Sequence, residues 1–511
     1  MTKSQLWSKL TLCLTLWAFS AALLMIASWN SYLHDIYPHY DTPWFFMCGK
    51  AWMNGLTPYV DFSDSKGPLL WLIYGLGYLI SPRDYTGVYW ISTIIFTIAF
   101  FYAYKSALLI TGNRATAVLA TAVIAFVLTV KWIHDETRCE DYCCAVTMPV
   151  IYYFVRCTFA TSSDDALVRK AALALGACLG ITILIKYNIA VMLAIAVPYF
   201  GWIVPHRLNY SPWRALIWII VGILAVTAPF AIIFTAQGCF GEFINEYFFV
   251  TAKTISNIQS SDTIGHKISF LLKTPSVLLF LSLIIVLVVI AAWKKPAWRW
   301  PLVIAFIWFG AIIAMNLKAP FYLQPLAPLA MPGIAVAVKP LNNILRLWQW
   351  KLITATGMTA LLVWGSNKTA FYNMQETTTQ RVFYYYAALE AQYKQPHIIY
   401  LNCHDLGSGV SADALPGCKY WSKQTGATPQ MLEETHDAIK QHKADVVIVR
   451  TYDELERQML DSLGYYCYTS QGAGVEYFER TLYSRLPLDT VKAAEFHITP
   501  HDILTKRRLF P

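Results

Sequence analysis

The stretch PSVLLFLSLIIVLVVIAAW, residues 275–293, contains no charged residue and is followed at once by Lys294 and Lys295. A bilayer core about 30 Å thick requires about 20 apolar residues in helical form, so this stretch predicts a transmembrane helix. The two lysines mark its cytoplasmic end, because cytoplasmic loops are enriched in Lys and Arg. The same pattern of apolar runs and basic loops recurs through most of the chain.

The composition of the whole chain agrees with a membrane protein. Of its 511 residues, 56% are hydrophobic and 14% are charged, and the mean hydropathy is +0.43. Soluble proteins carry about 25% charged residues, so a soluble enzyme is excluded. A disordered chain is excluded as well, because it could not keep so much apolar surface in water. The formal net charge of +9 comes from residues 1–365, where it reports loop orientation and is no argument for nucleic-acid binding.

The basic loops give every predicted span a direction. They put the N-terminus and four loops inside, so loops 30–67, 132–141 and 237–274 and everything after residue 365 lie outside. Loops 30–67 and 132–141 enclose three apolar segments, so one of the three cannot cross fully, and about eleven crossings are expected. The predicted spans are 11–28, 68–82, 86–110, 115–131, 142–160, 171–186, 188–204, 214–236, 275–293, 300–316, 321–338 and 352–365.

The tail of the chain differs in character from the rest. Strands are expected at 397–402 and 444–450, with a helix at 428–443 between them, N-capped by Thr428. A second helix at 451–463 and two closing strands at 465–470 and 475–481 follow. Cys403 and Cys418 could form a disulfide there or remain two free thiols.

The sequence therefore predicts a mainly α-helical fold with two domains. Residues 1–365 form a polytopic membrane helix bundle, and residues 366–511 form a small α/β domain outside the membrane. In a bacterial cell this is an integral inner-membrane protein with a cytoplasmic N-terminus and a periplasmic C-terminal domain.

Two residues of the first outer loop could carry chemistry. Asp41 precedes an amphipathic helical run at 44–53, and a carboxylate at the membrane surface could accept a proton from a hydroxyl nucleophile. The alternative is that Asp41 or Thr42 caps that helix. Lys66 enters the next apolar segment from outside, where its ammonium can reach a lipid phosphate. The alternative is a lysine that only extends to the membrane surface.

The second outer loop concentrates polar residues within 132–141. Asp135, Arg138, Glu140 and Asp141 could position an acceptor or hold a divalent cation. The alternative is a solvated loop in which Glu140 or Asp141 caps the next helix.

Three further polar groups have weaker signals. Lys186 lies in an expected tight turn between two spans and could face a phosphate, although a simple polar turn is favoured. Glu242 and Glu246 lie one helical turn apart and could line an acceptor groove, although a solvated helix face is favoured. His34 and His39 could join Asp41 as metal ligands, but that spacing is not diagnostic.

The order of three motifs resembles a known family. YDTPWFF at 40–46, GLTPYVDF at 55–62 and DSKGPLLW at 64–71 look like the first outer loop of the GT-C type membrane glycosyltransferases, which include the bacterial aminoarabinose transferases of lipid A and the protein mannosyltransferases. That family carries a catalytic acid in this loop, matched by Asp41. It carries a Lys-Pro or Lys-Gly-Pro element at the start of the second span, matched by Lys66. Its second acidic element, about a hundred residues later, is matched by Glu140 and Asp141.

The resemblance implies a glycosyltransferase. The enzyme would take a sugar from a polyprenyl-phosphate donor and place it on a hydroxyl of a lipid, glycan or protein acceptor at the outer face of the membrane. It implies Asp41 as general base, Lys66 as the donor-phosphate ligand and inversion at the anomeric carbon. Members of the family differ in metal dependence, so no metal is implied.

Two other functions remain as alternatives. One is a transporter or lipid-linked glycan flippase without covalent chemistry, and the other is a membrane glycan polymerase or ligase. Transporters tend to show internal repeats and ionisable residues near the bilayer midplane. This sequence keeps the acids of its membrane part largely in the outer loops.

Overall fold

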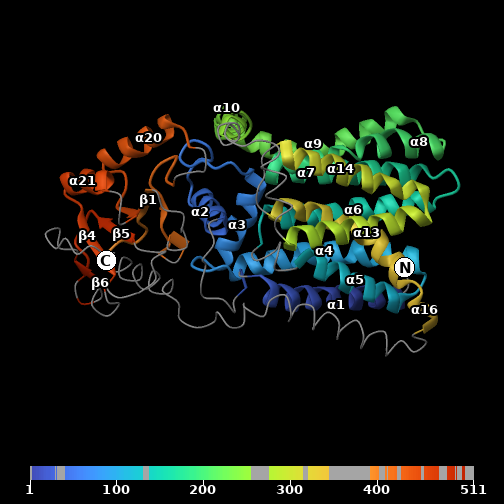
Figure 1. The fold of residues 1–511 in the computed structure, drawn as a ribbon. Helices are drawn as coiled ribbons and strands as arrows, with labels where there is room; N and C mark the ends of the chain where they lie inside the picture. Colours follow the sequence, from blue (N-terminus) through green and yellow to red (C-terminus); the bar gives the residue numbers. More distant parts are fainter. Residues whose placement is uncertain are drawn as a thin grey trace.

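The structure is a computed structural model. It describes residues 3–28, 30–31, 41–129, 137–254, 275–314, 320–344, 392–401, 409–410, 412–422, 427–450, 454–470, 480–489, 491 and 498–500. Within this part, long helices form a bundle at one end of the molecule, and a sheet with two helices forms the other end (Figure 1). The predicted division at residue 366, the span at 352–365 and Cys403 lie outside the described residues.

The helical bundle follows the predicted apolar segments. Seven of its described helices are long and apolar enough to cross a membrane, and α13 contains the stretch 275–293. The helical segments are α1 (Lys3–Ala27), α2 (Asp41–Met53), α3 (Pro68–Ile80), α4 (Thr86–Thr111), α5 (Arg114–Thr129), α6 (Cys139–Phe159), α7 (Asp165–Ala194), the π-helix η1 (Tyr199–Ile203), α8 (Val204–Arg207), α9 (Pro212–Ala236), α10 (Phe240–Ile244), the π-helix η2 (Asn245–Val250), α13 (Pro275–Lys294), the 3-10 helix η3 (Pro296–Arg299), α14 (Trp300–Ala314), the 3-10 helix η4 (Pro320–Ala330), α15 (Met331–Val338) and α16 (Leu341–Ile344).

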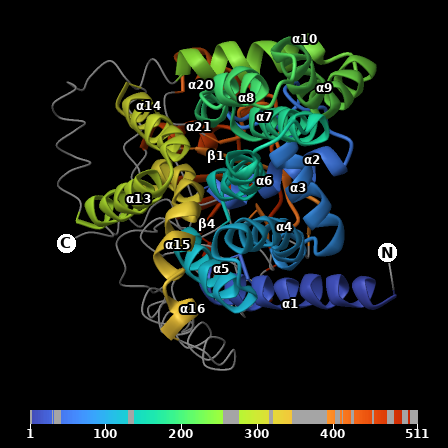
Figure 2. The same cartoon turned by 90° about the vertical axis from the view of Figure 1, so that its right-hand side faces the viewer.

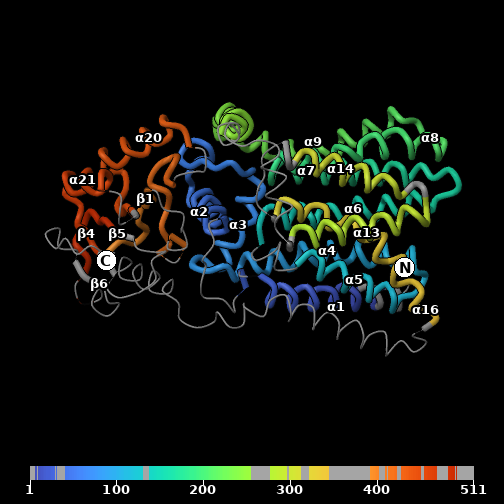
Figure 3. The backbone as a smooth tube through the Cα atoms, in the orientation of Figure 1, coloured from blue at the N-terminus to red at the C-terminus, as the bar shows by residue number. Residues whose placement is uncertain are grey.

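The segment that does not cross fully is α3. Its 13 residues span about 20 Å, which is shorter than the apolar core of a bilayer. The Tyr89 hydroxyl near the start of α4 donates to the Ala21 carbonyl near the end of α1, so α4 begins at the end of the bundle where α1 finishes. α3 therefore begins and ends on that side. α2 and α3 lie between the sheet and the long helices (Figure 3).

Helix α7 breaks at Lys186, where φ is −158° and ψ is 95°. Lys186 contacts Glu140 at the start of α6, whereas Arg207, 21 residues later, donates to the Cys157 carbonyl near the end of α6. The chain after Lys186 thus returns along α6, as the predicted turn between two spans requires. Viewed along the bundle, α6 lies at its centre, and it packs against α4, α7 and η4 (Figure 2).

The predicted span at 321–338 is not a uniform α-helix. Its first part is the 3-10 helix η4, and α15 follows. Pro325 and Pro328 lie inside η4 and lack the N–H group that an α-helix would use, which accounts for the difference.

The C-terminal domain is a mixed sheet with the strand order β2-β1-β3-β5-β4-β6. β1 pairs in parallel with β2 and β3, and the remaining pairs are antiparallel. The strand predicted at 475–481 overlaps β5 at residues 480 and 481, and its earlier residues lie outside the described part of the chain. β2 and β6 were not predicted. The elements are β1 (His397–Leu401), β2 (Leu415–Pro416), α20 (Pro429–Lys440), β3 (Val446–Arg450), α21 (Glu454–Ser462), β4 (Tyr466–Ser470), β5 (Arg480–Ser484) and β6 (Ile498–Pro500).

Local signals explain the ends of both helices in this domain. The Thr428 hydroxyl accepts a hydrogen bond from the Met431 N–H at 3.4 Å and caps α20, as predicted. Gly464, with φ of 76°, follows α21 and supplies the left-handed residue that commonly ends a helix. Cys418 is a free thiol.

Buried contacts dock this domain on α2. The Lys50 ammonium, fully buried, donates to the Gly409 carbonyl at 2.9 Å and lies 3.4 Å from the Asp413 carboxylate. The rings of Trp44 and Trp421 pack with their centroids 5.4 Å apart. Since Asp41 begins α2, the domain is anchored to the helix that carries the predicted catalytic acid.

Candidate active site

Most of the predicted site residues meet at the end of the bundle that faces the sheet domain. Asp41 begins α2, Lys66 precedes α3, Arg138 and Glu140 stand at the start of α6, and Lys186 occupies the break in α7. The Lys66 ammonium is within electrostatic range of both Asp41 and Lys186. Segments that are up to 145 positions apart in sequence therefore form one charged cluster.

Asp41 is the accessible acid of this cluster. Its carboxylate lies 3.8 Å from the Arg138 guanidinium, and its side chain is 38% exposed. The guanidinium is centred 4.5 Å from the Phe321 ring, which fixes it by a cation–π contact. Asp41 thus has a neighbouring cation and retains an open face at which a hydroxyl group could approach.

Glu140 and Lys186 form a buried ion pair. The Glu140 carboxylate lies 2.5 Å from the Lys186 ammonium and also accepts a hydrogen bond from the Cys139 thiol. The ammonium lies 4.5 Å from the centre of the Tyr322 ring. Glu140 is fully buried, so the alternative of a solvated loop is wrong for this residue.

The break that places Lys186 is held by Tyr247 of η2. The Tyr247 hydroxyl donates to the Ile183 carbonyl at 2.6 Å and accepts from the Tyr187 N–H at 3.0 Å. These two groups would bond each other in an unbroken helix, so the hydroxyl takes the place of one helical hydrogen bond. The Ile185 carbonyl is satisfied in turn by the Gly67 N–H at 2.9 Å.

Gly67 ties Lys66 to this break. A Cβ atom at Gly67 would lie 2.0 Å from the Leu184 carbonyl oxygen, so the close approach of the two segments requires glycine. Tyr247 could not be predicted from the sequence, because a tyrosine among apolar residues carries no local sign of a partner 64 residues away.

Lys66 is held by its own loop. Its ammonium donates to the Ser65 hydroxyl at 2.8 Å and lies 3.9 Å from the Asp64 carboxylate. Burial favours the neutral amine, but the carboxylates of Asp64 and Asp41 outweigh it and raise the pKa of Lys66 above its ordinary value. Lys66 is therefore a charged ammonium with a loosely held carboxylate partner.

Asp141 has the geometry of a helix cap, the alternative considered for it. Its carboxylate accepts hydrogen bonds from the Arg138 N–H at 2.9 Å and from the Gln324 amide of η4. Gln324 had no predicted role, since it lies 183 residues away. Asp135, His34 and His39 lie outside the described residues. The described part of the chain contains no group of three His, Cys, Asp or Glu side chains that could hold a metal ion.

Glu246 departs from its prediction. It is buried, and its carboxylate accepts hydrogen bonds from Lys419 at 2.8 Å, Tyr420 at 3.2 Å and Ser63 at 3.1 Å. The favoured interpretation of a solvated helix face is therefore wrong for Glu246, although Glu242 is exposed. Burial and this carboxylate raise the pKa of Tyr420, which keeps its hydroxyl a donor.

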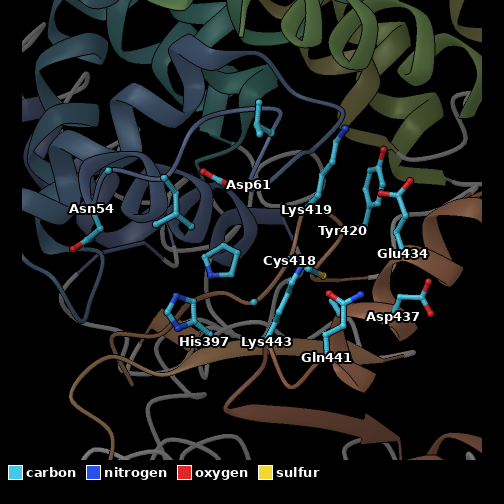
Figure 4. Close-up of a pocket in the computed structure, with 16 residues that line it drawn as sticks. Asn54, Asp61, His397, Cys418, Lys419, Tyr420, Glu434, Asp437, Gln441 and Lys443 are labelled. Carbon is cyan, nitrogen blue, oxygen red and sulfur yellow. The ribbon is translucent and has the colours of Figure 1, made fainter. Parts of the chain in front are cut away.

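A cavity of about 790 Å³ lies apart from the charged cluster, between the α2–α3 loop and the C-terminal domain (Figure 4). Nine charged, amide, histidine or tyrosine side chains surround it together with seven small or apolar residues. The lining residues are Asn54, Gly55, Leu56, Val60, Asp61, His397, Pro416, Gly417, Cys418, Lys419, Tyr420, Glu434, Asp437, Ala438, Gln441 and Lys443.

The chain is similar to known proteins in sequence pattern and in fold. Residues 65–233 match the family model described as dolichyl-phosphate-mannose-protein mannosyltransferase. Two crystal structures of ArnT from Cupriavidus metallidurans, one bound to undecaprenyl phosphate and one in the apo state, superpose with a TM-score of 0.56 at 12% and 13% identity. Each match covers 95% of this chain and 99% of the other chain. No curated protein matches the sequence.

These findings confirm the predicted resemblance. The chain has the fold of ArnT, and its residues 65–233 carry the sequence pattern of the dolichyl-phosphate-mannose-protein mannosyltransferases. The predicted helix bundle followed by a small sheet domain is confirmed with it, and so is the prediction of an integral membrane protein.

Proposed function

We propose that this protein is an integral membrane glycosyltransferase that transfers a sugar from a polyprenyl-phosphate-linked donor to an acceptor hydroxyl. The observation that carries the proposal is the cluster of Asp41, Lys66, Arg138, Glu140 and Lys186 at one end of the bundle. An open carboxylate beside several cations is what transfer from a phosphate to a hydroxyl requires. The match to the mannosyltransferase family model supports the same activity.

The cations of the cluster would bind the donor phosphate. Lys66 is suited to this role, because its ammonium stays charged and its carboxylate partner is 3.9 Å away. Lys186 adds a second positive charge from the α7 break, held in place by Glu140. Together they would stabilise the phosphate as it leaves, so the reaction needs no strong general acid.

Asp41 would act as the general base. The acceptor oxygen attacks the anomeric carbon of the sugar while its proton passes to the Asp41 carboxylate. The bond from that carbon to the phosphate oxygen breaks, and polyprenyl phosphate leaves as the anion. This direct displacement inverts the anomeric centre. Arg138, 3.8 Å from Asp41, would keep that carboxylate oriented, and Asp141 would keep the start of α6 in place.

The cluster would face the outside of a bacterial inner membrane. Lys294 ends α13 and Lys295 follows it, whereas no comparable basic pair bounds the start of this apolar stretch. Basic residues of this kind are retained in the cytoplasm, which supports a cytoplasmic N-terminus and a periplasmic C-terminal domain. Cysteine labelling from either side of the membrane would test this orientation.

The activity is tested by donor turnover. The purified protein in lipid receives a panel of radiolabelled polyprenyl-phosphate sugars, with a membrane extract as the acceptor source. Wild type should transfer one of the labels, and Asp41→Asn should lose about 10²–10⁴-fold in rate, because a positioned general base contributes that much. Asparagine also caps helices, so α2 should remain folded.

A matched variant distinguishes loss of the general base from the loss of one negative charge. Glu242→Gln removes an exposed carboxylate at the same end of the molecule and should transfer at the wild-type rate. Equal transfer by wild type and Asp41→Asn would reduce Asp41 to a helix cap. Absence of turnover with every donor, in protein shown to be folded, would overturn the glycosyltransferase and favour a transporter or an oligosaccharide ligase.

A further inference from the structure

The cavity beside the C-terminal domain lies at the far end of α2 from Asp41. α2 has 13 residues and so spans about 20 Å, and the lining residues Asn54 and Gly55 follow it directly. A ligand that reaches from the catalytic acid to this cavity must therefore be extended and several units long. The cavity volume of about 790 Å³ falls within the range usual for ligand pockets.

One wall of the cavity is a polar stripe on α20. Glu434, Asp437 and Gln441 recur at the spacing of one helix face, with the small Ala438 between them. Figure 4 shows these side chains on one side of the cavity, with Asp61 of the α2–α3 loop across from them. Carboxylates and amides facing each other over open space can accept and donate several hydrogen bonds to one ligand.

The two walls are fixed relative to each other. The Gln395 amide donates to the Asn54 side chain at 3.3 Å, and the Ser63 N–H donates to the Lys419 carbonyl at 2.9 Å. These bonds join the membrane module to the sheet domain on either side of the cavity. The space is therefore preformed, which lowers the ordering cost of binding.

The chemistry of the lining excludes phosphate and lipid chains as ligands. The Lys419 ammonium is engaged with Glu246 at 2.8 Å, and three carboxylates outnumber the remaining lysine, Lys443. An acyl or prenyl chain would require continuous apolar walls, whereas half of the lining residues here are charged or amide side chains, or His397.

An extended peptide is disfavoured as well. Peptides commonly bind by adding a strand to a sheet edge, and β2 is the edge strand beside this cavity. Pro416 in β2 has no N–H group to offer to such a strand. What remains is a neutral, hydroxyl-rich ligand.

We propose that this cavity binds the saccharide part of the acceptor, several sugar units from the hydroxyl that receives the new sugar. The inference rests on the proposed function, and it names the acceptor class as a glycan or glycolipid. Two lining residues also connect the cavity to the charged cluster. Lys419 and Tyr420 bond to Glu246, and the next residue, Tyr247, holds the break that carries Lys186.

Direct binding provides the test. The full-length protein in lipid nanodiscs is titrated with two neutral tetrasaccharides, one of hexose and one of N-acetylhexosamine units, and followed by saturation-transfer NMR. Gln441→Trp fills the cavity from the exposed residue that follows α20, and Glu433→Trp changes an exposed residue of α20 that does not line the cavity. We expect Gln441→Trp to weaken tetrasaccharide binding about tenfold, equivalent to about 1.4 kcal/mol, and Glu433→Trp to leave it unchanged.

A kinetic measurement distinguishes an effect on acceptor binding at the cavity from an effect on catalysis. In the transfer assay, Gln441→Trp should raise the acceptor KM about tenfold, with the donor KM and kcat unchanged. Binding of neither tetrasaccharide, equal binding by Gln441→Trp and wild type, or displacement of the sugar by a neutral decapeptide would each overturn the proposal. Donor consumption by the wild type is a separate readout. Saccharide binding without any donor turnover would support the cavity as a saccharide-binding site and would contradict the proposed glycosyltransferase activity.

Discussion

The two ion pairs at the candidate site differ in how firmly they are held. Glu140 and Lys186 lie 2.5 Å apart, and both are buried. Asp41 and Arg138 lie 3.8 Å apart, and the Asp41 side chain is 38% exposed. The first pair has supporting partners in Cys139 and Tyr322, whereas the second is open on the side of its carboxylate.

This difference indicates that the buried pair supports the structure and that the open pair is available for the reaction. Two charges taken out of water stabilise a protein only when their geometry is good, and removing one partner leaves the other at high cost. A half-exposed carboxylate carries little structural energy, so it is available for reaction. We therefore expect stability to respond mainly to the buried pair and transfer activity mainly to the open one.

The largest effect on stability should come from Glu140→Gln. It leaves the Lys186 ammonium buried without its carboxylate, which should lower the free energy of unfolding by about 3–5 kcal/mol. The double variant Glu140→Gln/Lys186→Met removes both charges and should recover most of that loss without recovering transfer. Thermal unfolding in detergent measures both. If Glu140→Gln were as stable as the wild type, the buried pair would contribute no more to the free energy of unfolding than the open pair does.

The next effect should come from Tyr247→Phe. Without the hydroxyl, the Ile183 carbonyl and the Tyr187 N–H lose their partner at the α7 break, which should cost about 1–3 kcal/mol. The donor KM should rise, because the Lys186 ammonium is no longer held in place. Tyr187→Phe is the matched control, since the structure gives that hydroxyl no hydrogen bond among the described residues. Equal donor KM values for both variants would assign Tyr247 to packing alone.

Arg138→Gln should change stability less. It removes the open pair with Asp41 and the contact with the Phe321 ring, which together should contribute about 1 kcal/mol. Chemical denaturation of Arg138→Gln and Glu140→Gln side by side measures the contrast directly. A loss for Arg138→Gln as large as that for Glu140→Gln would remove the distinction between the two pairs.

The smallest effect is expected at a surface pair in the sheet domain. The His436 ring nitrogen lies 2.9 Å from the Glu456 carboxylate, and this hydrogen bond raises the pKa of His436. The stabilisation is therefore complete below the pKa of an unfolded histidine, about 6.5, and is lost as the pH rises through the folded-state pKa. The partly exposed pair should contribute less than about 1 kcal/mol.

Thermal unfolding of wild type and Glu456→Gln at pH 5.5 and pH 8.5 checks this. The difference between the two proteins should be present at pH 5.5 and absent at pH 8.5. A stability difference that grows with pH would contradict the expected direction of the pH dependence. It would also show that the charged form of His436 does not make this bond.

The parts of the site that sequence could predict are those with a local pattern. Asp41, Lys66 and Glu140 stand in motifs whose order and spacing resemble a family, and Lys186 interrupts an apolar run. Tyr247 and Gln324 carry no such pattern, because each looks like an ordinary residue of its segment. Their partners lie 64 and 183 residues away, and only the packing of helices brings them together.

The fold shows the same division. Apolar runs predicted the long helices, because membrane thickness sets their length. They could not show which segment fails to cross, since α3 and α5 are both short apolar helices, of 13 and 16 residues. The prolines of η4 do carry a usable signal, because Pro325 and Pro328 each lack the N–H group of a regular α-helix and so indicate an irregular one.

The bond between Glu246 and Lys419 has a consequence for the order in which the protein is made. Its two partners are 173 residues apart, and a ribosome that adds about 5–20 residues per second needs roughly 10–35 s to synthesise the segment between them. During that interval Glu246 has already been synthesised but still lacks Lys419. The turn that supports Lys186 is thus completed late, so a nascent chain should acquire its full transfer activity only after the sheet domain has emerged and docked.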